Sequence, residues 1–341
     1  MLNWELIENS LQRSLAVIAA LTNLFLLHLI INKSPPKFGA YKYLMAYISI
    51  FEIIYAIDDV LIVPQLFTHG SAYLVIIDSD TTILSQKLIP PFVILYCVSF
   101  GMSMAIFAAH FVFRYLVVMG KSTWTLKKSP RLLIWFVVPF ILGLVWAFIC
   151  EVFLGPNEFM DKWIKDNMGT ISHINMEKDY YVGFYFYPTG PDGKKVWNWW
   201  NMIGTVLVTL IMMISSSIMF YFGYKCYKEI KSFTELNSRS KKFRSVQKQL
   251  FNALAFQTII PLITMHIPAS VLFLSCFAES SVEAMGRWLT VTIAMYPAID
   301  PLPNMFIIVD YRNAIIEYCS ICGVLRRKKS GGGLSSVSGI V

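Results

Sequence analysis

Residues 132–154 read LLIWFVVPFILGLVWAFICEVFL, an apolar run whose one charged residue, Glu151, lies near its end. About 20 apolar residues at a rise of 1.5 Å per residue cover a hydrocarbon core of roughly 30 Å. A backbone without water must bond its own N–H and C=O groups, so such a stretch is a helix. Residues 132–154 are therefore predicted to cross a membrane.

Six further stretches share this character, and we predict them at about 14–31, 43–66, 89–113, 198–222, 250–277 and 288–309. The hydrophobic fraction of 56% and the mean hydropathy of +0.57 exceed those of an ordinary soluble domain. The sequence thus predicts an all-α membrane protein, a seven-transmembrane helix bundle over residues 14–309. Residues 1–13 form a short N-terminal segment, and the ends leave no room for a second globular domain.

Lys and Arg gather in every second connection between the spans. Lys33, Lys37 and Lys42 follow the first span, and eight basic residues between Lys225 and Lys248 follow the fifth. Basic residues stay on the cytoplasmic side, so the N-terminus is expected outside and the C-terminus inside. The same asymmetry explains the net charge of +8 without any nucleic-acid partner, because basic loops adjoin anionic membrane lipid. Seven helices in this orientation are typical of G-protein-coupled receptors.

The long outer loop between the fourth and fifth spans turns aromatic at residues 180–187 and then reaches a Pro/Gly turn cluster at residues 188–193. This pattern predicts a strand and a possible β-hairpin, which could cover an outward-facing pocket or be an ordered loop without function. The loop contains no cysteine, so a disulfide from the third span to this loop has no partner.

A helical repeat of apolar residues continues after the seventh span. It predicts a short amphipathic helix on the membrane surface at residues 310–325, followed by a disordered basic and Gly/Ser-rich tail at 326–341. Cys319 and Cys322 lie just inside the membrane, where they are candidates for palmitoylation or for plain apolar packing.

Polar residues inside the spans are the main functional clues, because a carboxylate at the bilayer centre costs about 2.5–3.5 kcal/mol and should face the bundle interior. Glu52 and Asp59 share a helix face, and we assign Glu52 to a buried polar core. Asp59 faces either the outer cavity or another helix. Asp300 and Pro301 interrupt the last span, so this bend is a switch or a fixed kink.

A ligand pocket is predicted from depth and facing alone, with Asp59, Tyr96, Met102, His266 and Tyr296 as its candidates. His266 could equally be a packed interhelical partner. No catalytic motif, metal site or cofactor site is found, because HExxH, P-loop and GxSxG patterns are missing and nothing completes a metal site around Cys319 and Cys322. The chain is therefore not expected to be an enzyme.

Three strings resemble the nematode Str-type serpentine chemoreceptors, the family that includes the nematode olfactory receptor for diacetyl. They are residues 39–45 (GAYKYLM), residues 248–254 (KQLFNAL) through Pro261, and Tyr296-Pro297 through Asp310-Tyr311-Arg312. The resemblance runs over nearly the whole chain. It implies a multi-pass plasma-membrane receptor for environmental chemicals in the cilia of sensory neurons, with a heterotrimeric G protein α subunit as partner.

Arg114 and Tyr115 end the third span, and they match the acidic-Arg-Tyr motif of rhodopsin-like receptors except that Phe113 replaces the acid. The resemblance therefore implies that Arg114 and Tyr115 couple to the G protein, without the familiar Arg–acid lock.

The sequence favours a chemosensory receptor that binds a small odorant. Two alternatives stay open. A ligand-gated cation channel or transporter could use Glu52, Asp59 and Asp300 as a cation path, since buried acids fit either role. A non-signalling membrane protein would give no ligand response.

Overall fold

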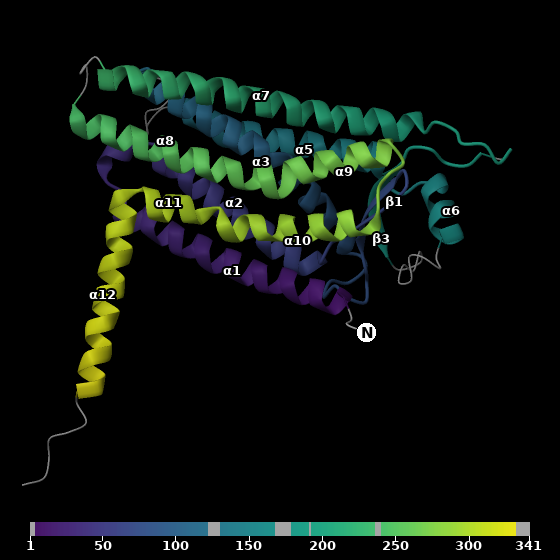
Figure 1. The fold of residues 1–341 in the computed structure, drawn as a ribbon, viewed down its shortest axis with the longest axis horizontal. Helices are drawn as coiled ribbons and strands as arrows, with labels where there is room; N and C mark the ends of the chain where they lie inside the picture. The colour runs from purple at the N-terminus through teal and green to yellow at the C-terminus, as the bar shows by residue number, and fades with distance from the viewer. Residues whose placement is uncertain (1–3, 122–129, 168–178, 191, 236–239, 332–341) are drawn as a thin grey trace, which may run out of the picture.

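The computed structural model describes residues 4–121, 130–167, 179–190, 192–235 and 240–331 (Figure 1). Within these residues the chain crosses a helix bundle seven times, which confirms the predicted architecture. The crossings are α1 (Trp4–Lys33), α2 (Tyr41–Ile62), α3 (Ile89–Val118), α5 (Ile134–Leu154), α7 (Trp199–Glu235), the interrupted helix α8–η3–α9 (Lys241–Pro261, Leu262–His266 and Ile267–Phe277) and the pair α10–α11 (Glu283–Ile299 and Pro301–Ile307).

Five of the helices in the described residues are long and apolar enough to cross a membrane by length and composition, and a sixth candidate is the bent pair of Glu283–Ile307 with Val309–Ser320. The remaining crossing is α2, which carries Glu52, Asp58 and Asp59. These acids lower its hydropathy, yet α2 packs between α1 and α3 and all three acids are buried.

A three-stranded antiparallel sheet covers one end of the bundle, which we call the sheet end; the N-terminus lies at the same end (Figure 1). Strands β1 (Gln65–His69) and β2 (Ala72–Ile77) form a hairpin around Gly70, whose φ of 58° suits a tight two-residue turn. The third strand, β3 (Tyr180–Tyr185), pairs with β2, with Leu74 opposite Gly183.

The strand predicted between the fourth and fifth crossings is thus present, and it pairs with β2, a partner that the sequence did not indicate. Just after β3 the chain folds back over the predicted turn. There Val196 N–H donates to the Pro188 carbonyl at 2.8 Å, Asn198 N–H donates to the Phe186 carbonyl at 2.9 Å, and Thr189 and Lys195 form an isolated bridge. The short helix α6 (Glu158–Asn167) packs beside β3, where the Tyr181 hydroxyl donates to Asp161 Oδ1 at 2.6 Å.

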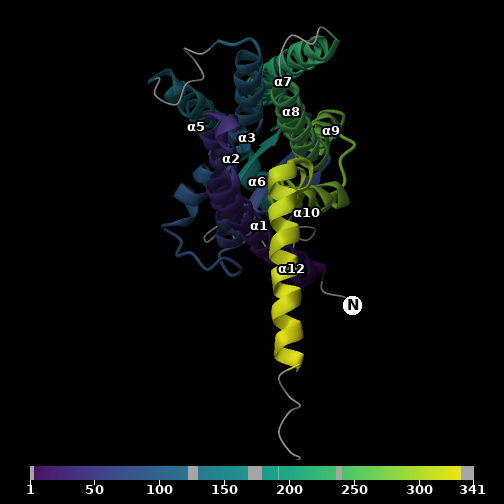
Figure 2. The same ribbon diagram turned by 90° about the vertical axis from the view of Figure 1, so that its left-hand side faces the viewer.

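Helix α12 (Val309–Gly331) leaves the opposite end, which we call the basic end, at 96° to the preceding helix. The turn occurs at Ile308, whose backbone is extended. Figure 2 shows α12 projecting away from the bundle. The predicted amphipathic helix is therefore present, and it runs beyond residue 325 into the segment expected to be disordered; residues 332–341 lie outside the described residues. Helix α1 and its following turn hold α12 through the ion pairs Lys33–Glu317 and Lys37–Asp310.

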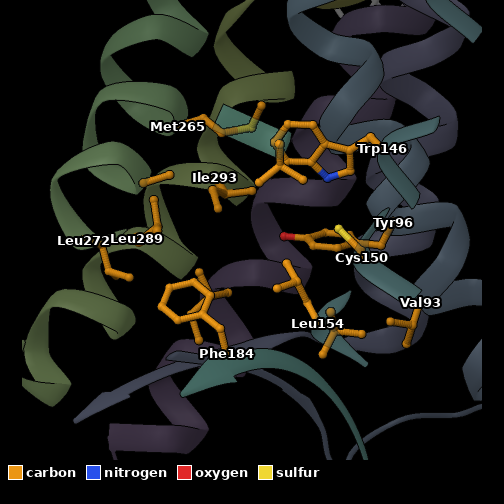
Figure 3. Packing of buried hydrophobic residues seen from close by; sticks show 14 of the residues in the cluster. Val93, Tyr96, Trp146, Cys150, Leu154, Phe184, Met265, Leu272, Leu289 and Ile293 are labelled. Atoms are coloured by element: carbon orange, nitrogen blue, oxygen red, sulfur yellow. The ribbon is translucent and has the colours of Figure 1, made fainter. Parts of the chain in front are cut away.

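Short 3₁₀ turns, η1 (Pro36–Phe38) and η2 (Pro130–Leu133), precede α2 and α5 at the basic end. The largest cluster of buried apolar residues lies at the sheet end and includes Tyr96, Trp146 and Phe184 (Figure 3). A second cluster, around Tyr41, Phe113 and Tyr311, fills the basic end. Glu52, Gln257 and Asp300 are buried polar residues of the spans.

Candidate functional site

A small cavity of about 60 Å³ lies under the sheet, among α3, α5, α7, α9 and α10. Its lining is aromatic and aliphatic with two cysteines, and none of its lining residues carries a charge. Figure 3 shows the ring of Tyr96 beside Cys150 at the centre of this region, with Phe184 below them and Trp146 above. The lining residues are Tyr73, Val75, Val93, Tyr96, Cys97, Phe100, Trp146, Cys150, Leu154, Val182, Gly183, Phe184, Val208, Ala269, Phe273, Leu289 and Ile293.

The sheet forms the roof of this cavity through stacked aromatic rings. Phe184 of β3 stacks on Tyr73 of β2 with ring centroids 5.1 Å apart, and it meets Phe273 of α9 edge-on at 5.2 Å. Gly183 is required beside them, because a Cβ at this position would lie 2.1 Å from the Tyr73 carbonyl oxygen. The close approach of β2 and β3 thus places both aromatic rings over the helices.

Tyrosine hydroxyls on both faces of β3 hold the sheet to the neighbouring helices. Tyr180 donates to Glu151 Oε2 at 3.3 Å, and burial raises the pKa of Tyr180 to about 12. Burial likewise raises the pKa of Tyr181, whose hydroxyl donates to Asp161. Both hydroxyls therefore stay protonated and remain donors at physiological pH, so the sheet keeps these bonds to α5 and α6.

Cys97 of α3 and Cys150 of α5 both line the cavity. The described cysteines Cys97, Cys150, Cys226, Cys276 and Cys319 are all free thiols. The thiol of Cys276 donates to the Ala72 carbonyl at 3.7 Å, which ties α9 to the edge of the sheet. The sheet is thus attached to the bundle by hydrogen bonds and aromatic packing.

The five predicted pocket residues lie in different places, and Tyr96 alone among them lines the cavity. Its ring packs on Tyr55 with centroids 5.5 Å apart, and the Tyr55 hydroxyl points to Met265 Sδ at 3.9 Å. Met102 packs toward Gly143 of α5, away from the cavity. Asp59 is buried, and its Oδ2 has no hydrogen-bond partner among the described residues.

The other two candidates also lie outside the cavity wall. Tyr296 is buried below the cavity, where its hydroxyl donates to Glu52 Oε1 at 3.2 Å. His266 ends the π-helical turn η3, and its Nε2 lies 3.2 Å from Ser103 Oγ. Phe100 packs edge-on against the His266 ring at 5.6 Å and also lines the cavity.

The predicted polar core joins α2, α8, α10 and α11. Glu52 and Asp300 are both buried, and the Tyr296 hydroxyl donates to Glu52 Oε1 at 3.2 Å. Gln257 of α8 donates to Asp300 Oδ2 at 2.6 Å, and Asn304 donates to Gln257 Oε1 at 2.9 Å. This network links the interrupted last crossing to α8.

Asp300 stands at the break between α10 and α11, and Pro301 begins α11. A proline at the first turn of a helix removes no hydrogen bond, because that N–H has no intrahelical partner. The first helix also reaches this break, since Asn23 Nδ2 donates to the Pro297 carbonyl at 2.9 Å. The last crossing is thus interrupted at Asp300, and α1, α2 and α8 pack around this position.

At the basic end, Arg114 connects α3 to α8. Its Nη2 donates to Gln247 Oε1 at 2.6 Å and to the Gln247 carbonyl at 3.1 Å. The guanidinium also lies over the Tyr41 ring, 4.8 Å from the centroid, and Arg114 is only 1% exposed. Tyr115 turns instead toward α7, where its ring meets Phe222 at 5.5 Å. The side-chain amide of Gln247 therefore binds Arg114 in place of the acidic side chain of an Arg–acid lock.

Sequence reasoning missed Tyr73, Phe184, Phe273 and Gln247. The hairpin that contains Tyr73 could have been predicted from the sequence, since Gly70-Ser71 separates two short runs rich in apolar residues. Gln247 had no such signal, because the rotation of α8 against α3 decides which of its residues meets Arg114. Of the two predicted lipidation sites, Cys319 is exposed on α12, and the side chain of Cys322 lies outside the described residues.

Comparisons with known proteins agree with this geometry. The family model described as "Serpentine type 7TM GPCR chemoreceptor Str" matches residues 8–316. The chain is 30% identical to the Caenorhabditis elegans "G-protein coupled receptor str-217" over 320 residues, which are 93% of this chain and 91% of that protein. It is 29% identical to the C. elegans "Serpentine receptor class r-10", with 84% of this chain and 82% of that protein covered, and 28% identical to the C. briggsae protein of the same name, with 90% and 88% covered. The chain therefore belongs to the Str family of serpentine seven-transmembrane G-protein-coupled chemoreceptors.

Proposed function

We propose that this receptor detects a small uncharged environmental compound in the cavity under the sheet and activates a heterotrimeric G protein at its basic end. The observation that carries this proposal is a charge-free cavity beneath the sheet in a member of a chemoreceptor family. The ligand is uncharged, because burying an ion in a wall without a countercharge costs far more than burying a neutral group. One water needs roughly 10–15 Å³ of such space, so a cavity of about 60 Å³ suits a compound with few non-hydrogen atoms.

The cavity and the basic end are connected through the bundle. Tyr96 of the cavity wall contacts Tyr55, which packs on Tyr296 with centroids 6.3 Å apart, and Tyr296 bonds to Glu52 of the polar core. A ligand shifts the receptor between two states only by its difference in affinity for them, and about 1.4 kcal/mol changes the ratio tenfold. A ligand that displaces Tyr96 would therefore bias the α8 and α10–α11 contacts below it.

The ligand site is tested by screening odorants on cells that express the receptor, with a calcium or cAMP readout. Ala269 is buried in the cavity wall, so Ala269→Leu should fill the cavity and lower ligand potency at least about tenfold. Ala278→Leu is the matched control, since Ala278 is exposed at the end of α9. Equal potency in both variants, at equal surface delivery, would place the ligand elsewhere.

We propose that Arg114, with Tyr115 beside it, couples the receptor to a Gα subunit. Arg114 is buried against Gln247, so coupling requires the basic end of α8 to move outward and release the guanidinium. Arg114→Ala should abolish ligand-evoked Gα activation while the receptor still reaches the cell surface. Unchanged signalling in this variant would defeat the assignment.

A cation channel would use Glu52, Asp59 and Asp300, and all three are at most 5% exposed. A ligand-evoked current that persists while G-protein signalling is blocked would favour this alternative over a receptor. We place the receptor in the plasma membrane of sensory cilia, a proposal that a tagged receptor in sensory neurons would test by its position relative to ciliary markers.

A further inference from the structure

A second and larger hollow of about 800 Å³ lies on the flank of the bundle, between α7 and the η3–α9 segment; we call it the α7–α9 cleft. Helix α7 packs against α8 but makes no comparable contact with α9, so the two outer halves separate. The rim carries exposed apolar side chains such as Met213 and Leu274, which are 60% and 68% exposed. In a membrane-spanning bundle this rim faces lipid, so the cleft opens to the bilayer.

The floor of the α7–α9 cleft includes His266, which is only 3% exposed. The hydroxyl of Ser103 donates its proton to the Phe100 carbonyl at 2.7 Å. Ser103 Oγ can then only accept from His266, so Nε2 carries the hydrogen of a neutral ring. The other ring nitrogen, Nδ1, is left as an acceptor, and it is buried without a partner among the described residues.

Four of the five hydroxyl groups that line the cleft are also acceptors, Ser216 being the fifth. Thr205, Thr209 and Ser217 of α7 each donate to the carbonyl four residues earlier, and Ser270 donates to the His266 carbonyl. Their protons are already used, so these four oxygens offer lone pairs only. A molecule that pairs with these oxygens or with Nδ1 of His266 therefore brings a hydrogen-bond donor.

We propose that the α7–α9 cleft binds an uncharged, mainly apolar alcohol dissolved in the bilayer, whose hydroxyl donates to Nδ1 of His266. This deepens the proposed receptor function, on which it rests, by naming a second ligand site and its chemistry. Phe273 lines both the cleft and the cavity under the sheet, so an occupant of the cleft contacts the wall of the cavity. The cleft admits longer molecules than the cavity does.

The test uses the full-length receptor in lipid nanodiscs with 1-octanol and methyl heptyl ether, which have equal numbers of non-hydrogen atoms but differ in the O–H donor. A ligand that binds the folded state raises the midpoint of thermal unfolding with its concentration. We expect the wild type to bind the alcohol about 3- to 10-fold more tightly than the ether, the factor that one hydrogen bond contributes. His266→Phe should remove this preference.

A second pair of variants keeps the test decisive if His266→Phe does not fold. Thr209 lines the cleft, whereas its exposed neighbour Leu210 does not. Thr209→Phe should abolish the stabilisation by 1-octanol, and Leu210→Phe should leave it unchanged. Equal stabilisation by alcohol and ether in the wild type would show an apolar lipid crevice only and would overturn the proposal. Stabilisation that survives in Thr209→Phe would overturn it as well.

This binding measurement needs no G protein, so it separates the two proposals. A receptor that binds 1-octanol at His266 but answers no compound in the signalling assay would refute the proposed function and leave the cleft site intact. A receptor that signals but shows no alcohol preference would refute the cleft site alone.

Discussion

At the scale of single residues, Gln247 decides how α3 and α8 are held together. A hydrogen bond to a charged group contributes about 1.5–3 kcal/mol, and an acid at this position would add a direct charge–charge attraction. The amide therefore binds Arg114 more weakly than an acidic side chain would. Because this bond is weaker, a ligand needs only a modest difference in affinity between the two receptor states to release α8.

Gln247→Ala removes the side-chain acceptor of Arg114 but keeps the arginine for coupling. We expect signalling without ligand to rise about tenfold or more, because a lost bond of about 1.5–3 kcal/mol shifts the two-state ratio by at least that factor. Gln247→Glu should lower basal signalling below the wild type, since the carboxylate forms a charge-assisted pair with Arg114. Nucleotide exchange on a co-expressed Gα subunit measures both effects.

Lys248→Gln is the control for these variants, because Lys248 is exposed and adjoins Gln247. Its basal signalling should not exceed that of the wild type. A rise in Lys248→Gln equal to that in Gln247→Ala would show a general effect on α8. Such a result would contradict the role of the Arg114–Gln247 bond.

At the scale of elements, the sequence predicted the membrane spans and the strand β3, but it did not predict which strand β3 pairs with. Each span is a continuous apolar run, so its helical state follows from local sequence and the absence of water. The pairing of β3 with β2 joins residues far apart in the chain, and only the packed helices bring Leu74 and Gly183 together. Tyr96 lines the cavity, as its depth and its helix face predicted. Met102 does not, because the rotation of α3 against α5 turns its side chain toward Gly143.

The close approach of β2 and β3 over the cavity allows a prediction about Gly183. Gly183→Ala places a Cβ against the Tyr73 backbone, and a backbone neighbour cannot give way as a flexible side chain can. We expect β3 to shift from β2 and the stacked Phe184 to leave the cavity, with a loss of ligand potency of at least about tenfold. Gly190→Ala makes the same chemical change against the exposed Val196 side chain, which can shift toward solvent, and should keep potency near the wild type. Equal potency in both variants, at matched surface delivery, would remove the sheet from the ligand site.

Helix α12 carries the exposed thiol of Cys319 beside the membrane surface. If this thiol is palmitoylated, Cys319→Ser should lower the acyl label recovered after thioester cleavage, and Cys322→Ser separates the contribution of the second cysteine. Cys226 is buried between α3 and α7, so Cys226→Ser is expected to leave the label unchanged. Labelling that persists in the double variant of Cys319 and Cys322 would exclude lipidation of α12.

At the scale of the whole molecule, apolar packing at the two ends encloses a polar layer in the middle. The cluster under the sheet and the cluster at the basic end are each built from aromatic and aliphatic side chains. Between them, the Tyr296 hydroxyl donates to Glu52 and Gln257 donates to Asp300, so hydrogen bonds link α2 to α10 and α8 to the α10–α11 break. These bonds are expensive to leave unmade inside a membrane. The polar layer therefore holds these helices together between the two apolar ends.

The orientation of this bundle decides which end meets the environment. From the distribution of basic residues we propose that the sheet end and the N-terminus lie outside and α12 lies inside. An epitope tag at the N-terminus should bind antibody on intact cells, whereas a C-terminal tag should bind only after permeabilisation. Total expression measured after permeabilisation controls for delivery. Labelling of the C-terminal tag on intact cells would invert the bundle, put the cavity on the cytoplasmic side and remove the basis for sensing a compound from outside.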